Sequence, residues 1–170
     1  MITKVARIVS SGFVALISIM AAALIVPRIL GYTPYTVLSG SMEPQYPIGS
    51  VVYVQQADPA LIGENDVVMY QLANGVPVTH RVVSVDSAQR TLITKGDANP
   101  TEDIAPIPLD AVVGKAVMCL PLLGYAALFV QTIPGLLCIA LITAAALLLP
   151  KAAGLMEDSI PKHPPKPTTL

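Results

Sequence analysis

Charged residues and cysteines are both scarce in this 170-residue chain, and each scarcity excludes a class of protein. Only 12% of the residues are charged and 54% are apolar, and the mean hydropathy is +0.66. Soluble globular domains carry about a quarter charged residues, so this composition indicates a membrane protein. The two cysteines, Cys119 and Cys138, are too few for a disulfide framework or a four-cysteine zinc site. No cluster of lysine and arginine suggests nucleic-acid binding.

Histidine is equally rare, which narrows the possible metal chemistry. His163 lies in a proline-rich C-terminal segment where no catalytic role is expected, whereas His80 lies inside a valine-rich run. Neither belongs to an HExxH pattern, so a zinc peptidase is disfavoured. The acidic loop at 95–103 begins like a calcium loop, with Asp97 and Asn99, but it lacks the required glycine and the terminal bidentate glutamate. We therefore expect no metal site.

Long uncharged runs occupy the two ends of the chain. Residues 8–27 contain no charge, and twenty helical residues span about 30 Å, the thickness of the hydrocarbon core. This run exceeds the roughly 7–15 apolar residues of a signal peptide, so we predict an uncleaved anchor. Lys4 and Arg7 favour a cytoplasmic N-terminus, although Arg28 on the far side weakens the bias.

A second uncharged run, residues 116–150, is longer than one membrane span. Its prolines and glycines predict a membrane-surface helix or a kinked start at 122–131, followed by a span at 136–149. Because fourteen residues are too few to cross the hydrocarbon core, the span would need to include residues of the preceding segment, or the bilayer would need to be thinner around it. Residues 151–170 are expected to form a flexible cytoplasmic tail.

The middle of the chain is acidic and rich in β-branched residues. Between residues 31 and 115 there are nine acidic and four basic side chains. Short apolar runs separated by turn residues predict about five antiparallel strands, at 50–55, 66–71, 76–86, 90–95 and 111–118. The predicted organisation is thus an anchor at 1–30, a small, mainly β domain at 31–118, an interfacial segment and second transmembrane helix at 119–150, and the tail at 151–170.

The stretch at 37–49, VLSGSMEPQYPIG, joins the anchor to this domain and contains Ser39 and Ser41. Serine, glycine and proline are ordinary turn residues, so a polar turn is one interpretation. The other is catalytic: Ser41, His80 and Asp103 would supply a nucleophile, a general base and an orienting acid. The residue types alone leave both open. The position of the stretch also suggests that Met42 and Tyr46 insert into the lipid interface.

Three motifs in one order resemble type I signal peptidases. They are VLSGSMEP at 37–44, VTHRV at 78–82 and TKGDANPTED at 94–103, and they lie between the two apolar runs. The resemblance covers roughly residues 5–120. The chain has His80 where one bacterial branch has a lysine, so it is similar to the endoplasmic-reticulum-type branch, which also occurs in archaea and some Gram-positive bacteria.

The resemblance implies a role for each motif residue. Ser41 would be the nucleophile, His80 the general base and Asp103 the orienting acid, with Asp97 as a supporting acid. The hydroxyl of Ser39 and the backbone N–H of Ser41 would form the oxyanion hole. The family loop more often ends in Asp-Asp, whereas this chain has Glu102 before Asp103, so an exchange of roles between these two acids stays open.

The implied protein is a membrane-bound serine endopeptidase that removes signal peptides from secretory preproteins and needs no cofactor. Its partners would be preproteins with small residues before the cut, the lipid bilayer and possible further membrane subunits. The catalytic domain would lie outside the cell membrane, a location we favour over the endoplasmic reticulum. Two alternatives stay open: a Ser-Lys peptidase of the same fold, with Lys95 or Lys115 as base, and a non-catalytic membrane-anchored β module.

Overall fold

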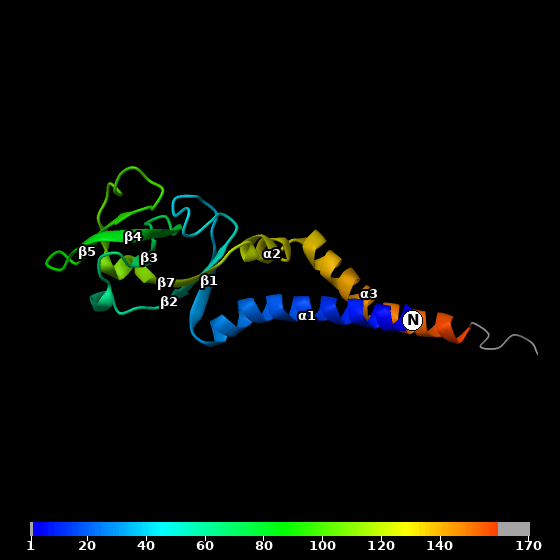
Figure 1. Ribbon diagram of the computed structural model, residues 1–170. Coiled ribbons are helices and arrows are strands. Elements are labelled where there is room, and N and C mark those ends of the chain that lie inside the picture. The colour runs from blue at the N-terminus through cyan, green and yellow to red at the C-terminus, as the bar shows by residue number, and fades with distance from the viewer. Residues whose placement is uncertain (1, 160–170) are drawn as a thin grey trace, which may run out of the picture. The chain divides into compact units, whose positions relative to one another are not determined.

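A computed structural model describes residues 2–159, and Figure 1 shows its elements along the chain. The chain divides into two compact units. One contains residues 23–129 and holds every strand, and the other combines residues 2–22 with the described residues from 130 onward. The candidate site lies in the first unit.

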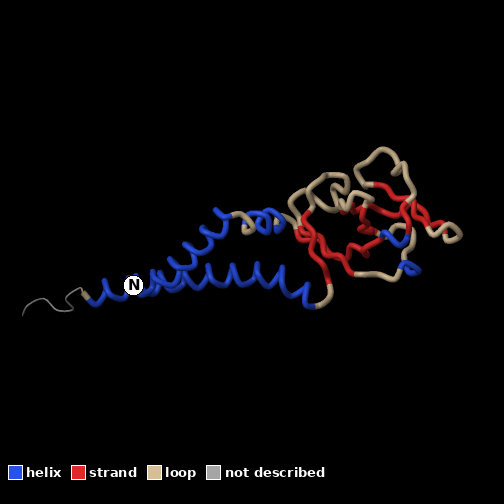
Figure 2. Tube along the Cα trace, turned by 180° about the vertical axis from the view of Figure 1, so that it is seen from behind, coloured by secondary structure: helices blue, strands red, loops and turns tan. Residues whose placement is uncertain are grey.

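Seven strands of the described chain form one antiparallel sheet in the order β1-β2-β7-β3-β4-β5-β6. The strands, red in Figure 2, curl around the core. Their bounds are β1 Tyr32–Thr36, β2 Val51–Gln55, β3 Val67–Gln71, β4 Pro77–Asp86, β5 Thr91–Lys95, β6 Ile107–Pro108 and β7 Val112–Leu120. The predicted mainly β, antiparallel class is confirmed. Two strands were not predicted: β1 contains Pro34, which is tolerated on an edge strand, and β6 lies in a proline-rich segment predicted as loop.

Successive side chains of the central strands pack into different cores, as the two-residue period of a strand requires. On β3, Val68 joins a cluster with Leu92 and Val82, whereas its neighbour Met69 packs with Met42. Both faces of the sheet are therefore buried near its centre. Met42 and Tyr46 are only 2% and 6% exposed, so the expectation that they insert into lipid is wrong.

Within residues 2–159, two helices are long and apolar enough to cross a membrane. They are α1, Ile2–Ile29, and α3, Ile133–Asp158, whose candidate spans have mean hydropathies of 2.4 and 2.3. The segment at 136–149, which by itself was too short for a span, lies inside α3, and the 26 residues of this helix supply the missing length. Thr132 caps its first turn, where Pro134 needs no N–H partner.

The helix α3 also continues through residues 151–158, which the sequence assigned to a flexible tail. Pro150 lies inside this helix and does not end it. The remainder of the predicted tail, including His163, lies outside the described residues.

A short helix, α2 (Leu123–Phe129), precedes α3 and packs on the β domain. Gly124 makes this contact possible, because a Cβ there would lie 2.6 Å from the carbonyl oxygen of Ser50 and 2.7 Å from that of Gly49. The predicted segment at 122–131 thus contains a separate helix, and this helix supports the end of the serine-containing stretch.

Candidate active site

Ser39 and Ser41 lie in a loop that connects β1 to β2 and is fixed at both ends. Val37 donates its backbone N–H to the carbonyl of Ser50 at 2.9 Å, and Gly49 donates to the carbonyl of Val37 at 2.9 Å. Between these points, successive turns replace regular structure. The buried side chains of Met42 and Tyr46 anchor the loop to the core, so the two serines have a defined place.

A second loop, residues 96–99, holds the backbone of Ser41 from the other side. The N–H of Ala98 donates to the Ser41 carbonyl at 2.9 Å. A Cβ at Gly96 would lie 2.6 Å from the same oxygen, so only glycine permits this approach. The GDAN segment therefore brings the motif after β5 against the serine motif after β1.

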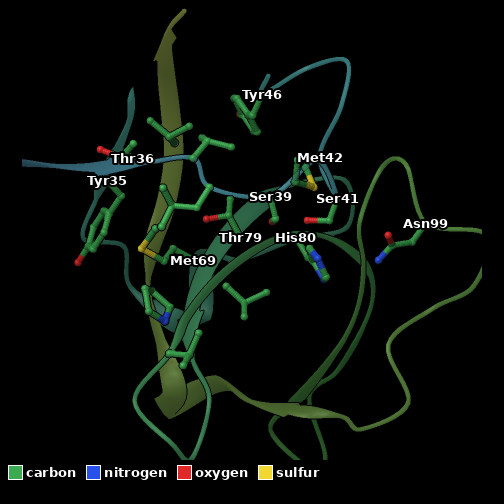
Figure 3. A pocket seen from close by; sticks show the side chains of 16 residues that line it. Tyr35, Thr36, Ser39, Ser41, Met42, Tyr46, Met69, Thr79, His80 and Asn99 are labelled. Carbon is green, nitrogen blue, oxygen red and sulfur yellow. The ribbon is translucent and has the colours of Figure 1, made fainter. Parts of the chain in front are cut away.

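A cavity of about 540 Å³ opens beside these loops. Its walls are the end of β1 with the serine loop, the beginning of β4, and single side chains from β2, β3 and the 96–99 loop. Ser39, Ser41 and His80 all line it, and Figure 3 shows them grouped together. Most of the other lining residues are apolar or small, which suits an uncharged extended ligand.

His80 and Asp103 form a short polar contact beside the cavity. His80 Nδ1 lies 2.6 Å from Asp103 Oδ2, and the side chains are 10% and 22% exposed. Because Nδ1 faces a carboxylate, it carries the proton in the neutral ring, which leaves Nε2 as an acceptor. No hydrogen bond joins the Ser41 hydroxyl to His80 within residues 2–159. Such contacts are often long before substrate binds.

Arg81, the next residue on β4, points to the face of the sheet opposite to that of His80 and pairs with Asp97. Its Nε and Nη2 donate to the two carboxylate oxygens of Asp97 at 2.8 and 2.7 Å. Arg81 also donates to the carbonyl of Asn65 at 2.9 Å and to the side chain of Gln45. It thus links the 96–99 loop to the serine loop without entering the cavity.

The two acids therefore differ in what they contact. Sheet register explains the difference: Arg81 pairs with Lys95, and Asp97 follows two residues later on the same face. Glu102, the alternative to Asp103, is exposed, and no contact of its side chain with His80 occurs in the described part of the chain.

Burial and hydrogen bonding act in opposite directions on Asp103. Burial raises the pKa of this carboxyl, but hydrogen bonds from Thr94, His80 and Tyr70 outweigh it and hold the pKa below its ordinary value. Burial, opposed by Thr94 and reinforced by the charge of Asp103, raises the pKa of Tyr70 to about 12. At neutral pH Asp103 is thus ionised and Tyr70 is a hydrogen-bond donor.

Sequence reasoning missed Thr94 and Tyr70. Thr94 donates to Asp103 Oδ2 at 2.6 Å and Tyr70 donates to the same oxygen at 3.1 Å. One signal was available, because Thr94 lies within the TKGDANPTED motif, but no sequence pattern distinguishes Tyr70 from a core residue.

The lysines considered as alternative bases lie outside the cavity lining. Lys115 Nζ bonds to Asp66 and to the carbonyl of Leu61, each at 2.6 Å. Lys95 lies on β5 opposite Arg81. Within residues 2–159, no group of three or more His, Cys, Asp or Glu side chains is arranged to hold a metal ion.

Curated proteins similar to this chain are signal peptidases. Signal peptidase I W of Bacillus subtilis is 38% identical over 84 residues, which are 48% of this chain and 44% of that protein. The signal peptidase complex catalytic subunit SEC11 of Scheffersomyces stipitis is 29% identical over 136 residues, covering 69% of this chain and 81% of that protein. SEC11 of Komagataella phaffii is 32% identical over 110 residues, covering 55% and 64%.

The chain thus spans less than half of the Bacillus protein and a larger share of the fungal proteins. No protein-family model matches the chain.

Proposed function

Because the chain belongs to the type I signal peptidases of the endoplasmic-reticulum and Gram-positive kind, we propose that it removes N-terminal signal peptides from secretory preproteins. The proposal includes the chemistry: Ser41 is the nucleophile, His80 the general base and Asp103 the acid that orients His80. The observation that carries it is the 2.6 Å contact between His80 Nδ1 and Asp103 Oδ2, made by a histidine that shares a cavity with Ser41.

In the proposed reaction, His80 Nε2 takes the proton of the Ser41 hydroxyl as Ser41 Oγ attacks the scissile carbonyl. The ionised Asp103 stabilises the resulting imidazolium. His80 then gives the proton to the leaving amine, and a water molecule, activated by the same ring, releases the acyl group from Ser41. The chemistry requires no cofactor.

The backbone N–H of Ser41 and the hydroxyl of Ser39 are the proposed oxyanion hole. Ser39 is exposed at the cavity rim and lies beside Ser41 in Figure 3. Removing one such donor typically lowers the rate by about 10²–10³-fold. Ser39→Ala should therefore reduce kcat while leaving the structure of the site intact.

The substrate is proposed to bind as an extended segment in the cavity. The cavity has the end of β1 with the serine loop on one wall and the start of β4 on another, so main-chain bonds to these segments would supply affinity. The apolar lining accepts small side chains before the cut. Supporting membrane subunits are a further proposal, suggested by the fungal relatives, which are named as subunits of a complex.

Two spans, from α1 and α3, are proposed to attach the enzyme to the cell membrane, with the β domain on the outer side. The division at 1–30, 31–118, 119–150 and 151–170 is retained as a proposal, with α3 running past residue 150. Attachment of enzyme and preprotein to one membrane raises their effective concentration, so weak substrate pockets suffice.

Cleavage of a preprotein by the full chain in detergent tests the proposal. We expect wild type to cleave and Ser41→Ala, His80→Ala and Asp103→Ala to lose nearly all activity, while Asp97→Ala loses part of it. Ser87→Ala, in the exposed turn after β4, is the matched control and should cleave like wild type. If Ser41→Ala still cleaves, the catalytic assignment is wrong. If Ser39→Ala cleaves as fast as wild type, the Ser39 hydroxyl is not part of the oxyanion hole.

A further inference from the structure

One oxygen of Asp103 accepts three hydrogen bonds, and the proposed reaction accounts for only one. His80 Nδ1 and Thr94 Oγ1 each lie 2.6 Å from Oδ2, and the Tyr70 hydroxyl lies 3.1 Å away. Thr94 and Tyr70 are 0% and 2% exposed, so water cannot readily replace either hydroxyl.

The sheet register places these side chains together. His80 on β4 pairs with Val68 on β3, and Tyr70 lies two residues further along the same face. Val82, two residues after His80, pairs with Thr94 on β5. Asp103 is attached to the same strand, because its N–H donates to the Thr94 carbonyl at 2.8 Å. Three neighbouring strands thus converge on one carboxylate oxygen.

We propose that Thr94 and Tyr70 are positioning residues that hold Asp103 as an ionised acceptor and thereby fix the His80 ring for proton transfer. The inference rests on the proposed function, since it assigns a role in the same reaction. Both hydroxyls have a single proton, and donation to Oδ2 requires that this oxygen carry none. The His80 proton is then on Nδ1, which leaves Nε2 bare.

Tyr70 also restricts the orientation of the ring. Its own ring meets that of His80 edge-on, with centroids 6.3 Å apart and planes at 73°. Its hydroxyl lies 3.4 Å from His80 Nδ1, beside the bond to Asp103. The buried Tyr70 side chain therefore occupies one side of the imidazole and limits the directions in which that ring can turn.

Thr94→Val tests the proposal because it removes the hydroxyl and keeps the shape. Hydrogen bonds to charged groups contribute about 1.5–3 kcal/mol, so we expect kcat for preprotein cleavage to fall about 10–100-fold with KM nearly unchanged. Thr94→Ser restores the donor and should recover most of kcat. Thr91→Val, the same change on the same strand but outside the site, is the control and should behave like wild type.

The pH profile of kcat/KM is a readout that a merely structural role would not move. The titratable groups facing Asp103 are His80 from β4 and Tyr70 from β3, while Thr94 from β5 does not titrate. Without the Thr94 hydroxyl, more negative charge on Asp103 faces the imidazolium and stabilises it. The acidic limb in Thr94→Val should therefore shift to higher pH, and Tyr70→Phe should cause a smaller shift in the same direction.

Proton NMR of the full chain in detergent micelles tests the geometry without activity. The far-downfield resonance of the His80 Nδ1 proton should move in Thr94→Val and return in Thr94→Ser. Circular dichroism and the thermal midpoint establish whether each variant is folded. If Thr94→Val is not folded, Tyr70→Phe tests the proposal in its place. The proposal would be overturned if folded Thr94→Val or Tyr70→Phe had the same kcat, the same acidic limb of the pH profile and the same Nδ1 proton resonance as wild type. An inactive wild type would contradict the proposed function instead, and the NMR result would still decide the positioning role.

Discussion

Arg81 and Asp97 form a two-pronged ion pair, with donor–acceptor distances of 2.8 and 2.7 Å, directly behind the candidate active site. The side chains are 27% and 20% exposed, so the pair is partly shielded from solvent. Because Arg81 also bonds to Gln45 and the Asp97 loop holds the Ser41 carbonyl, the pair fixes the position of the serine loop.

Asp97→Asn should therefore lower both stability and activity. It keeps the shape but loses the charge and one acceptor, and we expect a loss of about 1–3 kcal/mol in the free energy of unfolding. Activity should fall through kcat, because Ser41 is displaced while the cavity remains. Thermal unfolding and preprotein cleavage measure the two effects.

The matched control is Asp110→Asn, which breaks the exposed pair with Arg90. The Arg90 and Asp110 side chains are 63% and 80% exposed, and exposed pairs contribute about 0–1 kcal/mol. Equal effects of the two substitutions would contradict a positioning role for Asp97.

The pH dependence of stability should reveal the pair between Asp66 and Lys115. Burial raises the pKa of Asp66, but hydrogen bonds from Lys115 and the Gly63 N–H outweigh it and lower the pKa below 3.8. A carboxyl with a lowered folded pKa stabilises fully above its ordinary value and loses that contribution as the pH falls through the folded value. We expect the free energy of unfolding to decrease below about pH 4.

Asp66→Asn should flatten this decrease, whereas Glu64→Gln, at an exposed neighbouring position, should leave it unchanged. Denaturant unfolding at a series of pH values measures both slopes. The same acid dependence in Asp66→Asn as in wild type would exclude Asp66 as a source, and leave Asp103, whose pKa is also lowered.

Gly124→Ala should separate α2 from the serine loop. The added Cβ would lie 2.6 Å from the Ser50 carbonyl and 2.7 Å from the Gly49 carbonyl, both backbone atoms that cannot turn away. Overpacking of this kind typically costs about 1–3 kcal/mol. We expect a lower thermal midpoint and reduced kcat, because the loop end carrying Ser50 shifts. Gly154→Ala, with no atom within 4 Å of the new Cβ, is the control, and a wild-type midpoint for Gly124→Ala would disprove tight packing of α2.

The sequence predicted the β class, five of the seven described strands and the two apolar ends, because side-chain type and spacing encode these features directly. It missed β1 and β6, which contain proline, lie at the two edges of the sheet and each pair with a single neighbouring strand. The serine loop ends at Gly49, whose left-handed φ of 81° favours glycine, a conformation that the sequence pattern did not predict.

For the site, three motifs made Ser41, His80 and Asp103 the candidates, but motifs carry no distances. The preference for Asp103 over Glu102, the pairing of Asp97 with Arg81, and the roles of Thr94 and Tyr70 all depend on register between strands. A register of this kind is a tertiary property, set by which face each strand buries.

Substitutions of the two lysines and of His80 distinguish the proposed histidine mechanism from a Ser-Lys mechanism. Lys115 is held by Asp66 and the Leu61 carbonyl at 2.6 Å each, and neither Lys115 nor Lys95 lines the cavity with Ser41. Lys95→Ala and Lys115→Met should therefore keep kcat near that of wild type, and Lys115→Met should lose about 1 kcal/mol of stability from the broken pair. His80→Ala should lower kcat on the order of 10⁴-fold or more, because none of the other described residues that line the cavity is a base suited to accept the serine proton. Single-turnover cleavage of a preprotein measures all three. A lysine variant that is folded but inactive, beside an active His80→Ala, would show that lysine is the base.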